Sequence, residues 1–151
     1  MTTGLLKKRP AREYCFFLEA WILLAFSRSL IFFRPFRKLL PFLGKQIPKP
    51  EAEQAASEPV ASEALLKIIQ ISILRAGHRS PWRTMCFEQA LTARMMLHRR
   101  HIKSVIFFGV NINSEKKNKQ ITAHAWLICS DFTVTGGKNN QMFTVVGRFV
   151  V

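Results

Sequence analysis

The hydrophobic pattern of this chain changes its period once, near Ile102. Before that residue, apolar side chains recur at three- and four-residue spacing, which is typical of helices, and after it they follow a period of two. Helices therefore come first and strands second. This order predicts an α+β fold, in which a helix lies on an antiparallel sheet. The length of 151 residues fits one domain of ordinary size with a small appendage.

Two helices are expected between about residue 60 and the change of period. The first begins after Ser62, a suitable N-cap, and ends at Gly77. The second runs from about Cys86 to about His101, after a polar loop. Its inward face carries Cys86, Ala90, Ala93 and Leu97. Cys86 thus stands at the N-terminal end of that face, where the helix meets the loop.

The segment after Ile102 predicts strands over the ranges 105–112, 121–129, 132–135 and 142–150. The polar run 113–119 is expected as a turn, and Ser130-Asp131 as a tight turn. Strands in this succession, joined by short connections, predict an antiparallel meander.

Charge and proline content divide the chain into three segments. Residues 1–50 carry a net charge of +8, residues 51–66 carry −4, and the remainder carries +10. Residues 48–59 lack large apolar side chains and are bounded by prolines, which disfavour helix. The expected division is an N-terminal helical segment (1–46), a linker (47–60) and a C-terminal domain (61–151).

The apolar N-terminal segment does not predict a transmembrane helix. Glu19 and Arg28 interrupt it, and the uncharged run 20–27 is far shorter than the roughly 20 residues that a spanning helix needs. It also lacks the features of a secretory signal. An amphipathic helix that ends before Pro35, followed by a short helix over 35–43, is expected to pack on the C-terminal domain. Peripheral membrane contact through residues 14–43 is the alternative, in an otherwise cytoplasmic protein.

The three cysteines, Cys15, Cys86 and Cys129, exclude two classes of protein. They cannot all pair, and they show no CxxC spacing. A secreted disulfide-rich protein and a zinc finger are therefore excluded, and no metal or cofactor is expected. Cys15 and Cys129 are interpreted as packing residues.

Cys86 and His124 are the candidate catalytic residues. The free N–H groups of a helix N-terminus favour a thiolate and could hold an oxyanion. His124 lies in an otherwise apolar strand, on the sheet against which the Cys86 helix would pack. Helix-borne Cys followed by strand-borne His is the order of a Cys–His nucleophile pair. The alternatives are an inert core cysteine and a hydrogen-bonded core histidine.

Several short motifs around these two residues resemble one family. They are Pro81 with Cys86, the helix 90–94, Arg99-Arg100-His101, 108–110, Ala123-His124-Ala125-Trp126, 134–137 and 143–145. Together they are similar to the transglutaminase-like leader peptidases of lasso-peptide biosynthesis. The resemblance implies a papain/transglutaminase-like fold and a cysteine peptidase that removes the leader from a ribosomally made precursor peptide. It also implies two partners, a separate leader-binding protein and an ATP-using cyclase, with Cys86 as nucleophile and His124 as general base.

In the family a third residue, an Asp, completes a catalytic triad with the Cys and the His. This chain departs from that pattern, because it has Thr135 and Gly136 at the corresponding positions. Asp131 is expected at a hairpin tip, several residues along the ladder from His124 at about 3.3 Å per residue. In that register His124 lies opposite Gly137, and Thr135 and Asn139 share its face. Asp131, Thr135, Asn139 and a backbone carbonyl all stay open for the orienting role.

Two other functions stay open from the sequence. A thioester intermediate could pass its acyl group to an amine, as in transglutaminases. A formal net charge of +14 would also suit a non-catalytic binder of nucleic acid or anionic membrane. Against nucleic acid, the basic residues are scattered and no nucleic-acid-binding motif is present. The charge is better interpreted as a docking surface for peptide and partner proteins.

Overall fold

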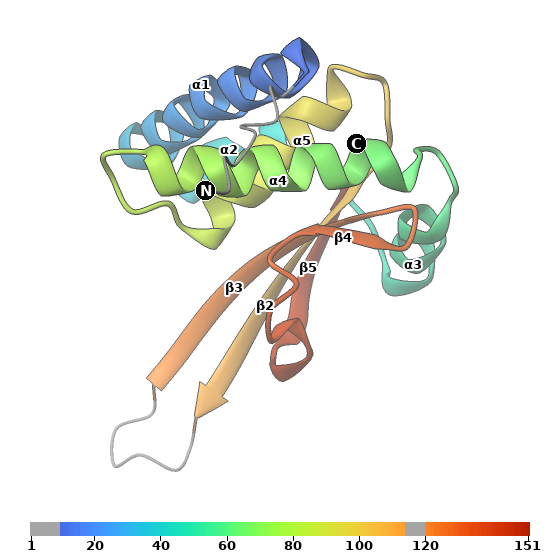
Figure 1. The fold of residues 1–151 in the computed structure, drawn as a ribbon. Helices are drawn as coiled ribbons and strands as arrows, with labels where there is room; N and C mark the ends of the chain where they lie inside the picture. Colours follow the sequence, from blue (N-terminus) through green and yellow to red (C-terminus); the bar gives the residue numbers. More distant parts are fainter. Residues whose placement is uncertain (1–9, 114–119) are drawn as a thin grey trace, which may run out of the picture.

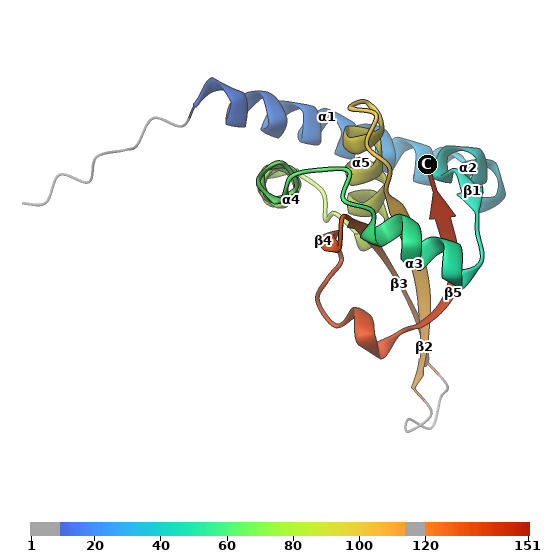
Figure 2. The ribbon, with the colours of Figure 1, turned by 90° about the vertical axis from the view of Figure 1, so that its right-hand side faces the viewer.

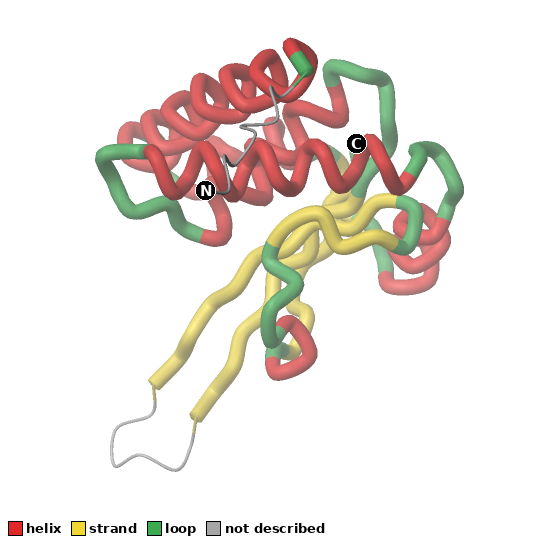
Figure 3. Tube along the Cα trace, viewed as in Figure 1, coloured by secondary structure: helices red, strands yellow, loops and turns green. Residues whose placement is uncertain are grey.

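The computed structural model describes residues 10–113 and 120–151. The helices α1, α2, α4 and α5 gather on one side of the molecule and the strands on the other, whereas α3 lies apart from them, beside the strands (Figures 1 and 3). The helices are α1 (Ala11–Phe33), α2 (Phe36–Leu43), α3 (Lys49–Ser57), α4 (Glu63–Arg79) and α5 (Cys86–His98), with a 3₁₀ turn, η1 (Asn140–Met142). The strands are β1 (Lys45–Gln46), β2 (Val105–Asn113), β3 (Gln120–Cys129), β4 (Phe132–Thr135) and β5 (Thr144–Val150). The expected turn 113–119 falls mainly on residues outside the described part.

The sheet is antiparallel throughout but is not a simple meander. Its strand order is β1-β5-β2-β3-β4, so β5 pairs with β2 instead of β4. The expected meander is therefore wrong in its last step. The loop 136–143, with η1, is long enough to carry the chain from β4 to the far edge of β2. There β5 buries Phe149 in the main core. The mixed helix and antiparallel sheet composition agrees with the α+β prediction.

The helix that bears Cys86 lies in the middle of the molecule. α5 packs against α1 and α4 on one side and against β3 and β4 on the other (Figure 2). Its buried apolar residues are Ala90, Leu91, Ala93, Met96 and Leu97. Burial on both sides fixes this helix, and hence the position of its first residue, relative to the sheet.

The segment 47–60 contains a helix, which the prediction of a linker did not include. Pro48 is the N-cap of α3 and Pro50 lies in its first turn, where a missing N–H costs nothing. Ala52 and Ala56, four residues apart, are buried against a second apolar cluster that includes Phe107. The prolines thus begin this helix. The division into segments 1–46, 47–60 and 61–151 stays a prediction.

The predicted end of α4 at Gly77 is wrong by two residues. Ser62 caps the helix as expected, since its side chain accepts a hydrogen bond from the Leu65 N–H. Gly77 lies inside the last turn, where a Cβ would come within 2.8 Å of the Thr84 hydroxyl oxygen. This glycine therefore permits a close approach of the following loop.

α1 is a packed helix that also meets simple criteria for a membrane span. Its apolar window has a mean hydropathy of 1.7, and only 22% of that window is buried. Core helices and signal sequences meet the same length and composition criteria, so this is weak evidence. The two charges that interrupt it are both paired: Arg28 with Glu88 of α5 at 2.7 Å, and Glu19 with Arg100, just after the end of α5, at 2.6 Å.

Candidate active site

A pocket of about 410 Å³ lies between the start of α5 and the strands β2 and β3. Both candidate catalytic residues line it, although they are far apart in the sequence. Its lining residues are Phe36, Met85, Cys86, Phe87, Phe108, Gly109, Val110, Ala123, His124, Ala125 and Val146. All of these except His124 and Cys86 are apolar, so the two candidate side chains lie in largely apolar surroundings.

Cys86 is the first residue of α5 and its side chain is partly exposed. The N–H groups of the first helical turn have no intrahelical acceptor, and they carry the partial positive charge of the helix N-terminus. These N–H groups provide donors for an oxygen that becomes negative beside Cys86.

His124 is oriented by a backbone carbonyl. Its Nε2 lies 2.8 Å from the carbonyl oxygen of Gly136. Because a carbonyl oxygen can only accept, Nε2 carries the hydrogen in this bond. In the neutral ring Nδ1 then has the free lone pair, which is the property a general base requires.

Aromatic rings confine the His124 imidazole further. Its centroid lies 4.9 Å from the Phe143 ring and 5.7 Å from the Trp126 ring. Rotation of the imidazole is thus limited by two aromatic neighbours as well as by the Gly136 carbonyl.

Gly136 is required by the backbone conformation that presents this carbonyl. Its φ is +70°, and a Cβ at this position would come within 2.5 Å of the Ala125 carbonyl oxygen. Both features exclude larger residues. An irregularity between Leu127 and Ile128 shifts the pairing of β3 with β4, so the last pair is Leu127 with Thr135. The predicted pairing of His124 with Gly137 is therefore not formed.

None of the three side chains considered for the orienting role hydrogen-bonds His124 in the described part of the chain. Asp131 lies at the tip of the β3–β4 hairpin and accepts a hydrogen bond from Ser57. The Thr135 hydroxyl is buried without a hydrogen-bond partner. Asn139 is exposed, with a φ of +62°. The Gly136 carbonyl, one form of the backbone alternative, makes the contact that these side chains do not.

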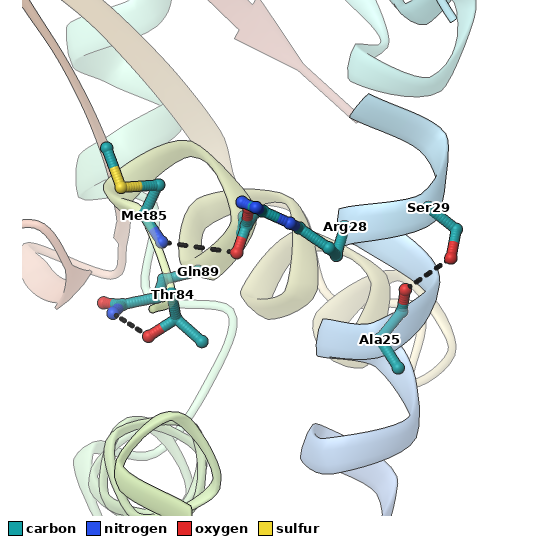
Figure 4. Close-up of polar contacts among 7 residues, drawn as sticks. Ala25, Arg28, Ser29, Thr84, Met85 and Gln89 are labelled. Carbon is teal, nitrogen blue, oxygen red and sulfur yellow. Dashed lines mark hydrogen bonds and ion pairs between the residues drawn. The ribbon is translucent and has the colours of Figure 1, made fainter. Parts of the chain in front are cut away.

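The sequence reasoning missed Glu88, which stabilises the start of the Cys86 helix. Its side chain is only 1% exposed and accepts a hydrogen bond from the Met85 N–H at 3.3 Å. The Arg28 guanidinium pairs with it from α1 at 2.7 Å. Figure 4 shows Arg28 extending from α1 toward the start of α5, where Met85 and Gln89 are labelled. The signal in the sequence was an acid at the third helical position, which suits an N-terminal capping box.

Phe36 was also missed, and it brings the N-terminal segment to the pocket. Its ring contacts those of Phe87 and Phe108, with centroids at 5.9 and 5.8 Å. Phe87 and Phe108 also contact each other at 5.2 Å. No local pattern links an aromatic residue at the start of α2 with a strand so distant in the sequence.

The other two cysteines lie outside the pocket. Cys129 is buried, as expected of a packing residue, and its thiol donates to the Lys103 carbonyl oxygen. Burial raises the pKa of the Cys129 thiol. Cys15 is exposed on α1, so the prediction that it packs in the core is wrong. Within residues 10–113 and 120–151, no group of three or more His, Cys, Asp or Glu could hold a metal ion.

Comparison with known proteins identifies a superfamily. A search of curated proteins and a search of solved structures each returned no match. The family model described as the transglutaminase-like superfamily matches residues 30–148, which is most of the chain and includes α2. Members of this superfamily are usually cysteine peptidases or transferases. A match of this extent shows that the chain belongs to the transglutaminase-like superfamily.

Proposed function

We propose that this protein is a cysteine peptidase that cleaves the leader from a ribosomally made lasso precursor peptide. Cys86 is the nucleophile, His124 is the general base, and the Gly136 carbonyl orients the imidazole. The observation that carries the proposal is a single pocket that Cys86 and His124 both line, with the His124 Nε2 bonded at 2.8 Å to a carbonyl oxygen. The superfamily match and the motifs around Cys86 and His124 support it.

In the first half of the reaction, His124 Nδ1 takes the proton of the Cys86 thiol. The sulfur forms a bond to the scissile carbonyl carbon, and the electron pair of the C=O bond moves to oxygen. The N–H groups at the start of α5 stabilise this oxyanion. The C–N bond then breaks as the imidazolium gives its proton to the leaving amine. The core peptide departs with a free amino group, and the leader remains as a thioester on Cys86.

The second half consumes one water. His124 Nδ1 takes a proton from the water, whose oxygen attacks the thioester carbonyl. The C–S bond breaks, the proton returns to the sulfur, and the leader departs with a free carboxyl group. A charge that develops on the imidazole at each step is stabilised by the Gly136 carbonyl, which keeps its hydrogen bond to Nε2.

The proposed partners follow from the proposed substrate. A separate leader-binding protein would present the precursor, and an ATP-using cyclase would close the ring of the released core. The exposed basic residues of the chain, with a formal net charge of +14, suit contacts with acidic segments of such partners.

Substitution of the three cysteines tests the proposal with matched controls. We expect Cys86→Ala to abolish cleavage of the cognate precursor, in the presence of its leader-binding protein, while the circular dichroism spectrum is unchanged. Cys15→Ala and Cys129→Ala are the controls and should retain cleavage. Cleavage at the wild-type rate by Cys86→Ala would refute the role of this residue.

Acyl transfer is the second candidate, because the superfamily also includes transferases. In that case an amine, in place of water, attacks the Cys86 thioester. The masses of the products distinguish the two reactions. A free leader carboxylate and a free core indicate hydrolysis, and a leader joined to an amine indicates transfer.

A further inference from the structure

The outer side of the N-terminal helices carries a row of exposed apolar residues. On α1 these are Tyr14, Leu18, Ile22, Phe26, Phe32 and Phe33, which we call the outer apolar face. The first four are spaced four residues apart, and Phe33 follows Phe26 by seven, so they lie along one side of the helix. Phe32 and Phe33 are 76% and 78% exposed.

The inner side of α1 already has partners within the fold. Phe16, Ala20, Leu24 and Leu30 are buried, and α1 packs on α4 and α5. The outer apolar face is therefore not needed for the fold. A contiguous exposed surface of this kind on a helix usually marks an interaction site.

The short helix α2, which follows α1, also carries exposed apolar residues. Leu40 and Phe42 are exposed, while Leu39 and Leu43 are buried in the core. Figure 2 shows α1 and α2 along one side of the molecule, with the sheet on the other. The two helices together thus present an exposed side away from the strands.

Of the described residues of α1, Arg34 and α2, the charged side chains outside the ion pairs of the fold are all basic. Arg12, Arg34, Arg37 and Lys38 are exposed at the ends of α1 and on α2. The two acids of α1 are engaged elsewhere, Glu13 with Arg75 and Glu19 with Arg100. An apolar stripe with basic residues at its ends and no free acid is complementary to a surface that is both apolar and anionic.

We propose that α1 and α2 dock this protein on the surface of an anionic phospholipid bilayer, with the outer apolar face inserted among the acyl chains. The apolar side chains enter the interface, and Arg34, Arg37 and Lys38 contact the lipid phosphates. Glu19 stays paired with Arg100, just after α5, and Arg28 stays paired with Glu88 of α5, so the helix lies on the membrane without crossing it.

This arrangement would place the candidate active site close to the membrane. Phe36, at the start of α2, lines the pocket of Cys86 and His124 and is itself half exposed. A precursor peptide held near the lipid surface would then reach the pocket from its α2 side. The docking proposal does not depend on the peptidase proposal, because binding is measured without any substrate.

Co-sedimentation with vesicles tests the proposal. We expect the full chain to sediment with vesicles of phosphatidylglycerol and phosphatidylcholine, and far less with phosphatidylcholine alone. The variant Leu18→Glu with Ile22→Glu places two carboxylates in the outer apolar face, and its binding should fall by about tenfold or more. Ile121→Glu is the matched control, since Ile121 is 68% exposed on β3 and should bind like the wild type.

Three results would overturn the proposal. The first is a wild-type chain that does not sediment with anionic vesicles. The second is equal loss of binding in the double variant and in Ile121→Glu. The third is a stable dimer in size-exclusion chromatography that the double variant disrupts, because a second copy would then cover this face. Circular dichroism of both variants checks that each is folded.

Discussion

The three cysteines of this chain lie in three different environments. Cys86 is at the start of a helix and lines the same pocket as His124, Cys15 is exposed on α1, and Cys129 is buried. Since only the thiolate attacks, these environments predict three different reactivities.

We expect iodoacetamide to modify Cys86 and Cys15 in the folded protein and to leave Cys129 unmodified until the chain is unfolded. Burial keeps reagent from Cys129 and raises the pKa of its thiol, so its thiolate fraction at neutral pH is lowered. His124→Ala should slow the modification of Cys86 and leave that of Cys15 unchanged. Mass spectrometry of a time course measures all three sites, and rapid labelling of Cys129 in the folded chain would contradict this assignment.

Gly136 provides a second prediction at the scale of single residues. Gly136→Ala puts a Cβ where the Ala125 carbonyl oxygen lies and strains a φ of +70°. The carbonyl that accepts from His124 must shift, and we expect kcat to fall by about tenfold or more with little change in KM. The measurement is steady-state cleavage of the precursor.

Gly137→Ala is the control for this substitution. A Cβ there meets only the Thr133 side chain, at 3.1 Å, and Gly137 has no positive φ. We expect its kcat to stay near the wild-type value. Equal losses in the two variants would mean that the loop as a whole, and not the Gly136 carbonyl, matters.

At this scale the sequence could predict which side chains share the pocket but not what orients the imidazole. Cys86 and His124 carried visible signals: a helix start, and a polar ring in an apolar strand. A backbone carbonyl has no residue type of its own. Its position depends on the irregularity between Leu127 and Ile128, which follows from long-range packing.

At the scale of the elements, an ion pair between Arg28 and Glu88 joins α1 to α5. Glu88 is buried and Arg28 is about half exposed, so removal of the arginine leaves a carboxylate without its compensating charge. We expect Arg28→Met to lower the free energy of unfolding by about 1–3 kcal/mol. Glu88→Gln should cost less, because the amide oxygen can still accept from the Met85 N–H.

The double variant Arg28→Met with Glu88→Gln checks this interpretation. Once the carboxylate is neutral, the loss of Arg28 should matter less, so the two effects should not add, with a coupling of about 1 kcal/mol. Denaturant unfolding of the four proteins measures it. Strict additivity would show that the two side chains act independently.

For some elements the local sequence pattern is enough to predict the structure. α4, α5 and β3 follow from capping residues and periodicity. Two features do not follow from such patterns. One is α3, whose alanines are buried in a second apolar cluster, and the other is the pairing of β5 with β2. Both depend on contacts between distant residues, which a local pattern cannot specify.

For the whole molecule, the formal net charge of +14 predicts that the catalysed reaction depends on salt. If the basic surface attracts acidic segments of the precursor or of its leader-binding protein, kcat/KM should fall severalfold between about 50 and 200 mM NaCl, with kcat little changed. Cleavage kinetics at several salt concentrations measure this. An unchanged kcat/KM would contradict an electrostatic role for the surface.

The central claim is that Cys86 carries the leader as a thioester during the reaction. The most direct measurement is mass spectrometry of the enzyme after acid quenching of a reaction with excess precursor, followed by digestion. Catalysis through Cys86 predicts an adduct of the leader mass minus one water on the peptide that contains Cys86, and no adduct in Cys86→Ala. An adduct on another residue, or undiminished cleavage by Cys86→Ala, would contradict it.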